Sequence, residues 1–162
     1  MDKKYLIIIS LIIFSSALFA SRNASLNISF SIPEIQTITL NASHLNFNLM
    51  FTGNQSNPQY PYEPHIETIS YNITSTSANP KRLLASLNQN MPTNVSLEVN
   101  AQAPTGANSM GFVPLDSSVK PLVTGIKSVN EPGRLMYFRL SATLGAQVAT
   151  NENRTITFTI SD

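Results

Sequence analysis

The chain contains no cysteine and no tryptophan, and it has only two histidines among its 162 residues. Without cysteine there is no disulfide and no thiolate chemistry, so a folded domain must depend on packing and on backbone hydrogen bonds. Charged residues make up only 12% of the sequence, and they are scattered along it. Nucleic-acid binding needs a clustered basic surface, so the sequence predicts no nucleic-acid partner.

The common catalytic and metal-binding motifs are also missing. The chain has no Gly-x-Ser-x-Gly elbow, no His-Glu-x-x-His zinc helix and no phosphate-binding or calcium-binding loop. One candidate is the series Glu63, His65 and Glu67, which could hold a divalent metal or act in acid–base chemistry. We expect instead that Ile66 points into the core and that these three residues lie on the solvent face of a strand. The sequence therefore predicts no catalytic residue, no metal, no cofactor and no enzymatic activity, with a secreted enzyme as a distant alternative.

The first twenty residues have the pattern of a secretory signal peptide. Lys3 and Lys4 precede an apolar run at residues 5–19 that three serines interrupt, and Ala20 offers a small residue for cleavage. The run is short for a membrane span, which usually takes about twenty apolar residues, but a retained membrane anchor is the alternative. We predict a signal peptide at residues 1–20, a single domain at residues 21–162, a secreted or cell-surface location, and no membrane span after signal removal.

Beyond residue 20 the sequence alternates between apolar and polar residues with a period of two, which is typical of strands with one buried face. The clear runs are residues 26–32, 45–51, 69–73, 95–101, 136–142 and 156–160, and shorter ones are residues 36–40, 82–87 and 119–124. Residues 81–88 could be helical, but the alternation of Leu83, Ala85 and Leu87 favours a strand. We predict an all-β, antiparallel two-layer sandwich with Ig-like, Greek-key connections and about seven to nine strands.

The run that follows the predicted cleavage site carries four alternating apolar residues, Leu26, Ile28, Phe30 and Ile32, and Pro33 ends it. A terminal strand of this kind can pair with another subunit, because its backbone offers ladder hydrogen bonds and its alternate side chains fill pockets. It can also fold back into its own sheet as an ordinary first strand. The sequence leaves both alternatives open.

Two stretches of the chain resemble secreted Ig-like sandwiches of the pilus and surface-coat type. Residues 24–40, ASLNISFSIPEIQTITL, are similar to the mature starts of fimbrial major subunits. The run from residues 121–126 through residues 134–142 to residues 155–160 resembles the closing half of fimbrial-subunit and spore-coat-U-like domains. Because the chain lacks the cysteine pair of many chaperone–usher subunits, it is more similar to the cysteine-free pilin branches. The resemblance implies that the N-terminal strand of one subunit completes the sheet of the next, with Leu26, Ile28, Phe30 and Ile32 as anchors.

The loop at residues 58–64, PQYPYEP, contains two tyrosines between prolines, which favour an extended conformation. Tyr60 and Tyr62 could stack on a sugar or pack against a neighbouring subunit, or they could cap one end of the core.

The sequence therefore predicts a non-enzymatic structural or adhesin-like protein, a pilus-like subunit whose partners are other copies of itself or other envelope proteins. The alternative is an extracellular carbohydrate-binding module that uses Tyr60 and Tyr62 to bind a glycan.

Overall fold

The computed structural model describes residues 25–51, 62–147 and 152–162. The chain divides after Ile32 into two units, and every described strand belongs to the second unit, Pro33–Asp162. The strands are β1 (Gln36–Leu40), β2 (His65–Ser75), β3 (Lys81–Leu87), β4 (Val95–Ala101), β5 (Asn108–Ser109), β6 (Val113–Pro114), β7 (Lys120–Ile126), β8 (Val129–Ala142) and β9 (Ile156–Ser161). The described residues form no helix, so none of them builds a helix that could cross a membrane.

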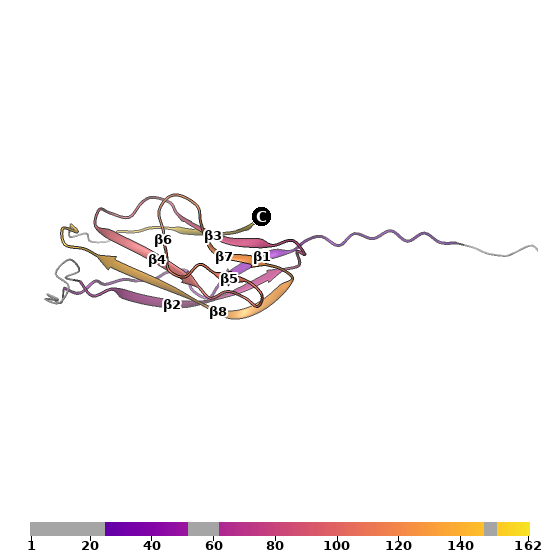
Figure 1. The fold of residues 1–162 in the computed structure, drawn as a ribbon, viewed down its shortest axis with the longest axis horizontal. Helices are drawn as coiled ribbons and strands as arrows, with labels where there is room; N and C mark the ends of the chain where they lie inside the picture. The colour runs from indigo at the N-terminus through magenta and orange to yellow at the C-terminus, as the bar shows by residue number, and fades with distance from the viewer. Residues whose placement is uncertain (1–24, 52–61, 148–151) are drawn as a thin grey trace, which may run out of the picture. The chain divides into compact units, whose positions relative to one another are not determined.

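The strands form two antiparallel sheets. One sheet has five strands in the order β1-β2-β8-β4-β6, and the other has four strands in the order β5-β7-β3-β9. The longest pairing joins β2 to β8, which lie side by side in Figure 1. Strands that follow one another in the sequence alternate between the sheets from β2 through β9, so the chain crosses repeatedly from one sheet to the other. The predicted all-β, antiparallel two-layer sandwich is therefore confirmed.

The core lies between the two sheets and is built by the period-two pattern of the strands. The buried positions of β2 are Ile69, Tyr71, Ile73 and Ser75, which alternate with more exposed residues. The same alternation buries the apolar positions of β3, β4 and β8. Because successive side chains of a strand point to opposite faces, each sheet turns one apolar face toward the other. The fully buried members with the largest side chains include Tyr71, Phe138, Ile73, Leu83, Leu122, Ile126 and Met136.

The strand predicted at residues 45–51 does not form. Leu45 and Phe47 do pack against the core as half-buried side chains, but the only strand-like pairing in this segment is a single bridge between Phe51 and Tyr62. The backbone N and O atoms of Asn48 lie 3.1 Å and 3.0 Å from Nδ1 of His65. Asn48 therefore contacts β2 through the side chain of His65.

Tyr71 gives the core a hydrogen bond whose strength can be measured. Its side chain is 1% exposed, its hydroxyl donates to the carbonyl oxygen of Gln102 at 2.5 Å, and burial raises its pKa to about 12. We predict that Tyr71→Phe lowers the free energy of unfolding by about 1 kcal/mol, because the carbonyl of Gln102 loses its donor. Chemical denaturation of the purified protein measures the change. Tyr137→Phe on the neighbouring strand β8 is the control, and an equal loss in both variants would contradict a specific role for the Tyr71 hydroxyl.

Candidate functional site

Residues 25–32 expose the four apolar side chains that the sequence places at every second position. Leu26, Ile28, Phe30 and Ile32 are each between 78% and 85% exposed, and residues 25–32 form no strand. Burying one side chain of this size is worth roughly 1.5–3 kcal/mol. Four such exposed side chains within seven residues are therefore a strong driving force for association with an apolar surface.

The edges of the sandwich in Pro33–Asp162 are of two kinds. β5 and β6 are edge strands of two residues each, whereas the edge strands β1 and β9 have five and six residues. Very short edge strands offer little backbone for pairing with another chain, and longer ones offer a row of donors and acceptors. β1 and β9 lie next to each other. Both long edges are therefore on the same side of the sandwich, which we call the β1–β9 side.

The β1–β9 side is lined by apolar residues that are only half covered. Ile156, Phe158 and Ile160 of β9 and Ile38 of β1 pack against the core without being fully buried. Among the described strands β9 pairs with β3 alone, so the described part of the chain provides no strand for its other edge. The β1–β9 side thus combines an edge that no described strand covers with half-buried apolar positions that repeat every second residue.

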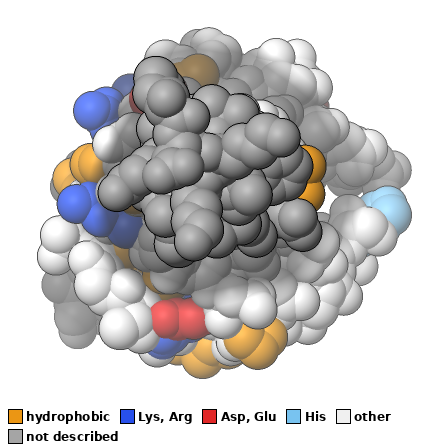
Figure 2. Space-filling model, turned by 90° about the vertical axis from the view of Figure 1, so that its right-hand side faces the viewer, with side chains coloured by type: hydrophobic (Ala, Val, Ile, Leu, Met, Phe, Trp, Pro, Cys, Tyr) orange, Lys and Arg blue, Asp and Glu red, His pale blue; other side chains and the backbone are white. Residues whose placement is uncertain are grey.

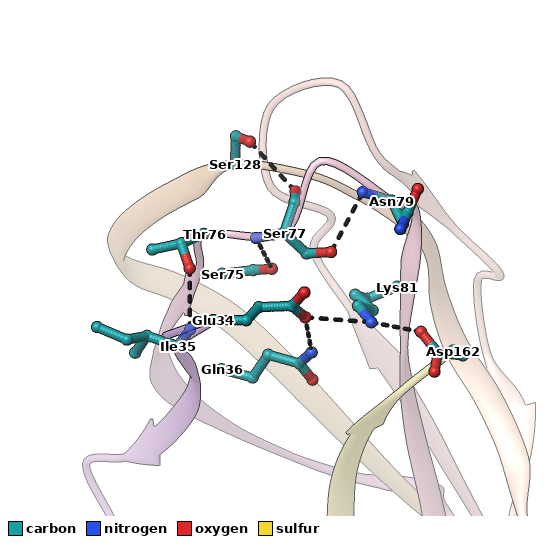
Figure 3. Close-up of polar contacts among 10 residues, drawn as sticks. All are labelled: Glu34, Ile35, Gln36, Ser75, Thr76, Ser77, Asn79, Lys81, Ser128 and Asp162. Carbon is teal, nitrogen blue, oxygen red and sulfur yellow. Dashed lines mark hydrogen bonds and ion pairs between the residues drawn. The ribbon is translucent and has the colours of Figure 1, made fainter. Parts of the chain in front are cut away.

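One end of the β1–β9 side holds a set of polar groups that we call the Lys81 cluster, consisting of Glu34, Gln36, Lys81 and Asp162 (Figure 3). Lys81 is the first residue of β3, and its side chain is 9% exposed. Its Nζ lies 3.1 Å from Oε1 of Glu34 and also donates to Oδ1 of Asp162. Gln36 donates a further hydrogen bond to Glu34. The cluster therefore joins the residues just before β1, at the start of β3 and just after β9.

The electrostatics of the Lys81 cluster favour the charged form of both partners. The hydrogen bonds to Asp162 and Glu34 raise the pKa of Lys81 against the opposing effect of burial. The hydrogen bonds from Gln36 and Lys81 lower the pKa of Glu34. A lysine without partners at this buried position would be costly, because an ionised group loses its hydration there. Two carboxylates thus compensate the charge of the Lys81 ammonium group at this buried position.

Sequence reasoning did not single out the Lys81 cluster, although part of the signal was present. The alternation of Leu83, Ala85 and Leu87 extends back to residue 81, which places Lys81 on the inward side of β3. A buried lysine then predicts carboxylate partners. No local pattern, however, identifies Glu34 and Asp162 as those partners, because Glu34 lies just before β1 and Asp162 just after β9, both far from β3 in the sequence.

His65 and Glu67 lie on the inward face of β2 and Ile66 on the outward face, so the predicted orientation was wrong for these three residues, whereas Glu63 is exposed as predicted. Ile66 is 53% exposed, whereas the two polar residues share the face of β2 that carries Ile69 and Tyr71. The strict period of β2 determines the orientation, and it overrides the apolar character of Ile66. Nε2 of His65 lies 2.9 Å from Oε1 of Glu67. The described residues contain no group of three metal-ligating side chains.

The predicted ligand loop is described only in part. Tyr60 lies outside the described residues. Tyr62 is half-buried and makes a T-shaped contact with the ring of Phe51 at a centroid distance of 5.8 Å. This contact reduces the area of the Tyr62 ring that is available to stack on a sugar.

Basic side chains in the described residues are mostly next to acidic ones. The ion pairs outside the Lys81 cluster include Lys120–Asp116, Arg134–Glu131, Arg139–Glu98 and Arg154–Glu152. Figure 2 shows one end of the molecule, where coloured basic and acidic side chains occur together with hydrophobic ones. Such mixed charges give a nearly neutral surface in these regions rather than a basic one.

A comparison with protein-family models, curated proteins and solved structures finds no significant match.

His65 predicts a pH dependence of stability. Its hydrogen bond to the backbone of Asn48, followed by that to Glu67, raises its pKa above the ordinary 6.5. Because the folded pKa is higher than the unfolded one, the stabilisation is complete below about pH 6.5 and is lost as the pH rises through the folded value. We predict that His65→Gln removes this loss from the pH profile of thermal unfolding, measured against the parent protein. His44→Gln is the control, and a parent profile that His65→Gln leaves unchanged would contradict the assignment.

Proposed function

We propose that this protein is a non-enzymatic structural subunit of the cell surface or extracellular space that assembles by strand addition. In this proposal residues 26–32 of one copy pair with the β1–β9 side of another copy. The proposal rests on the exposure of Leu26, Ile28, Phe30 and Ile32, and on a sandwich in Pro33–Asp162 whose two long edges are on one side.

The two surfaces match in their period. The anchors of residues 26–32 repeat every second residue, and so do Ile156, Phe158 and Ile160 of β9. A strand paired with β9 would form main-chain hydrogen bonds along that edge, and its alternate side chains would cover the half-buried positions. The polar residues between the anchors, such as Asn27 and Ser29, would then face solvent. This division of roles is what strand addition requires of a donor segment.

The expected binding free energies indicate that both the anchor side chains and the backbone hydrogen bonds contribute to assembly. Four anchors at roughly 1.5–3 kcal/mol each give a gross gain on the order of 6–12 kcal/mol. Association of two molecules costs about 4–15 kcal/mol in lost freedom of motion. The apolar gain alone is thus close to the cost, so stable assembly depends on the ladder of hydrogen bonds along β9 as well. Losing even one anchor is therefore expected to weaken assembly strongly.

The composition fits a subunit that works by association. The sequence has no recognisable catalytic motif, and charged residues are few. The carbohydrate-binding alternative has less support, because Tyr62 packs on Phe51 within the chain itself. Glycan binding by the parent protein that Tyr60→Ala and Tyr62→Ala abolish, with assembly unchanged, would favour that alternative.

We predict that a peptide of residues 24–32 binds and stabilises a truncated chain that begins at Pro33. The truncated chain keeps every described strand, including β1 and β9. A ligand at 100 times its dissociation constant adds about 2.7 kcal/mol of stability, which corresponds to a rise of about 5 °C or more in Tm for a domain of this size. Thermal unfolding with and without the peptide measures the shift.

The matched control is a peptide in which Ile28 and Phe30 are both replaced by Asp, which should give no shift. A second peptide that exchanges the residue types of Asn27 and Ser29 keeps all anchors and should act like the parent peptide. If the parent peptide and the Asp-substituted peptide have the same effect, the anchors do not direct binding and the proposal is contradicted.

A further inference from the structure

The chain between the last anchor and β1 is held by two sets of contacts. Ile35 continues the ladder between β1 and β2, because its N–H donates to Oγ1 of Thr76 at 2.9 Å and its carbonyl oxygen accepts from the N–H of Thr76 at 3.0 Å. Glu34 is held by Lys81, as Figure 3 shows. Both residues are therefore fixed in the direction that β1 sets.

These contacts bear on whether residues 26–32 can enter the β1–β9 side of their own sandwich. To do so the chain must reverse between Ile32 and Gln36, where β1 begins. The loop would consist of Pro33, Glu34 and Ile35. If residues 26–32 turned back to pair with β1, this would be a three-residue hairpin loop, which normally contains a residue in the left-handed region, usually glycine or asparagine. None of the three residues is of these types, and none has a positive φ.

A reversal would also break the contacts of Glu34 and Ile35. Release of Glu34 would leave the 9% exposed side chain of Lys81 with Asp162 as its remaining carboxylate. Removing one partner of a buried charge costs more than breaking an exposed ion pair, because the remaining charge stays poorly hydrated. Both backbone groups of Ile35 would lose their partner Thr76 as well. The local sequence and the Lys81 cluster thus oppose the same movement.

We propose that the Lys81 cluster is a latch that prevents the chain from inserting residues 26–32 into its own sandwich. This inference rests on the proposed strand addition and concerns its regulation. The latch keeps the donor segment free and the β1–β9 side open in the same molecule, which makes a second copy of this chain the partner for both. Assembly then proceeds between copies instead of ending in closed monomers.

The test measures amide hydrogen exchange at residues 26–32 in the parent protein and in variants that lack the latch. All are measured as monomers, at concentrations where size-exclusion chromatography shows no oligomer. The latch is broken by Glu34→Ala and by Lys81→Met, each made separately and together in the full chain. Lys120→Met removes a half-exposed ion pair of similar length, 3.1 Å to Asp116, and serves as the matched control. An Asn-Gly dipeptide inserted between Ile32 and Pro33 adds a turn and shows the exchange of a self-inserted segment.

The parent and Lys120→Met monomers are expected to exchange freely at residues 26–32. The latch variants are expected to exchange at least tenfold more slowly there, and to form less oligomer when concentrated. Glu34→Ala alters an accessible side chain, so it decides the question if Lys81→Met does not fold. Equal exchange in the latch variants and the control would overturn the latch, and so would slow exchange in the parent monomer.

Failure of the latch and failure of the proposed function give different results. If the parent never forms oligomers at any concentration, strand addition between copies is contradicted, but the comparison of exchange in monomers still decides the latch. If the parent forms oligomers and the latch variants do so equally with equal exchange, strand addition stands and the latch is overturned.

Discussion

The constraint on which the rest depends is that both long edges of the sandwich, β1 and β9, lie on the same side. A two-layer sandwich buries the inner face of each sheet, but an edge strand keeps one row of backbone donors and acceptors unpaired. On the other side the edges are the two-residue strands β5 and β6. Hence the backbone capacity for a further strand is concentrated at the place where apolar side chains of β9 are only half covered.

The lack of cysteine makes the Lys81 cluster more important to this architecture. No disulfide ties β9 to the rest of the sandwich, so the strand is held by its ladder with β3, by packing and by the pair between Lys81 and Asp162. The same ammonium group holds Glu34 at the start of β1. One buried charge therefore contacts both the residue just before β1 and the residue just after the edge strand β9.

The sequence predicted those features that follow from local periodicity, and it failed where a partner decides the outcome. The alternation in β2, β3, β4, β8 and β9 was sufficient for the fold class, because each of these strands buries one face. Residues 45–51 have an equally regular alternation, but they form no strand, and the backbone of Asn48 contacts the ring of His65 instead of a backbone partner.

The candidate site shows the same division. Leu26, Ile28, Phe30 and Ile32 could be selected from the sequence, because the pattern and the following proline are local. Whether they enter their own sheet or that of another copy could not be decided from the sequence, because both outcomes use the same local pattern of anchors. The orientation of Ile66 was predictable in principle from the period of Ile69 and Tyr71, but its apolar side chain suggested the opposite.

The most direct measurement of the central claim is cross-linking between copies, which the cysteine-free sequence makes specific. One population carries Ser29→Cys in the donor segment, and others carry Thr157→Cys or Thr159→Cys at exposed positions of β9. Residues opposite each other on paired antiparallel strands are about 4.5–5.5 Å apart at Cα, which suits a disulfide. Strand addition at β9 predicts that mixed populations form disulfide-linked dimers through Thr157→Cys or Thr159→Cys, and not through Ser109→Cys on β5. Dimers that form equally through β5, or through neither β9 position, would contradict it.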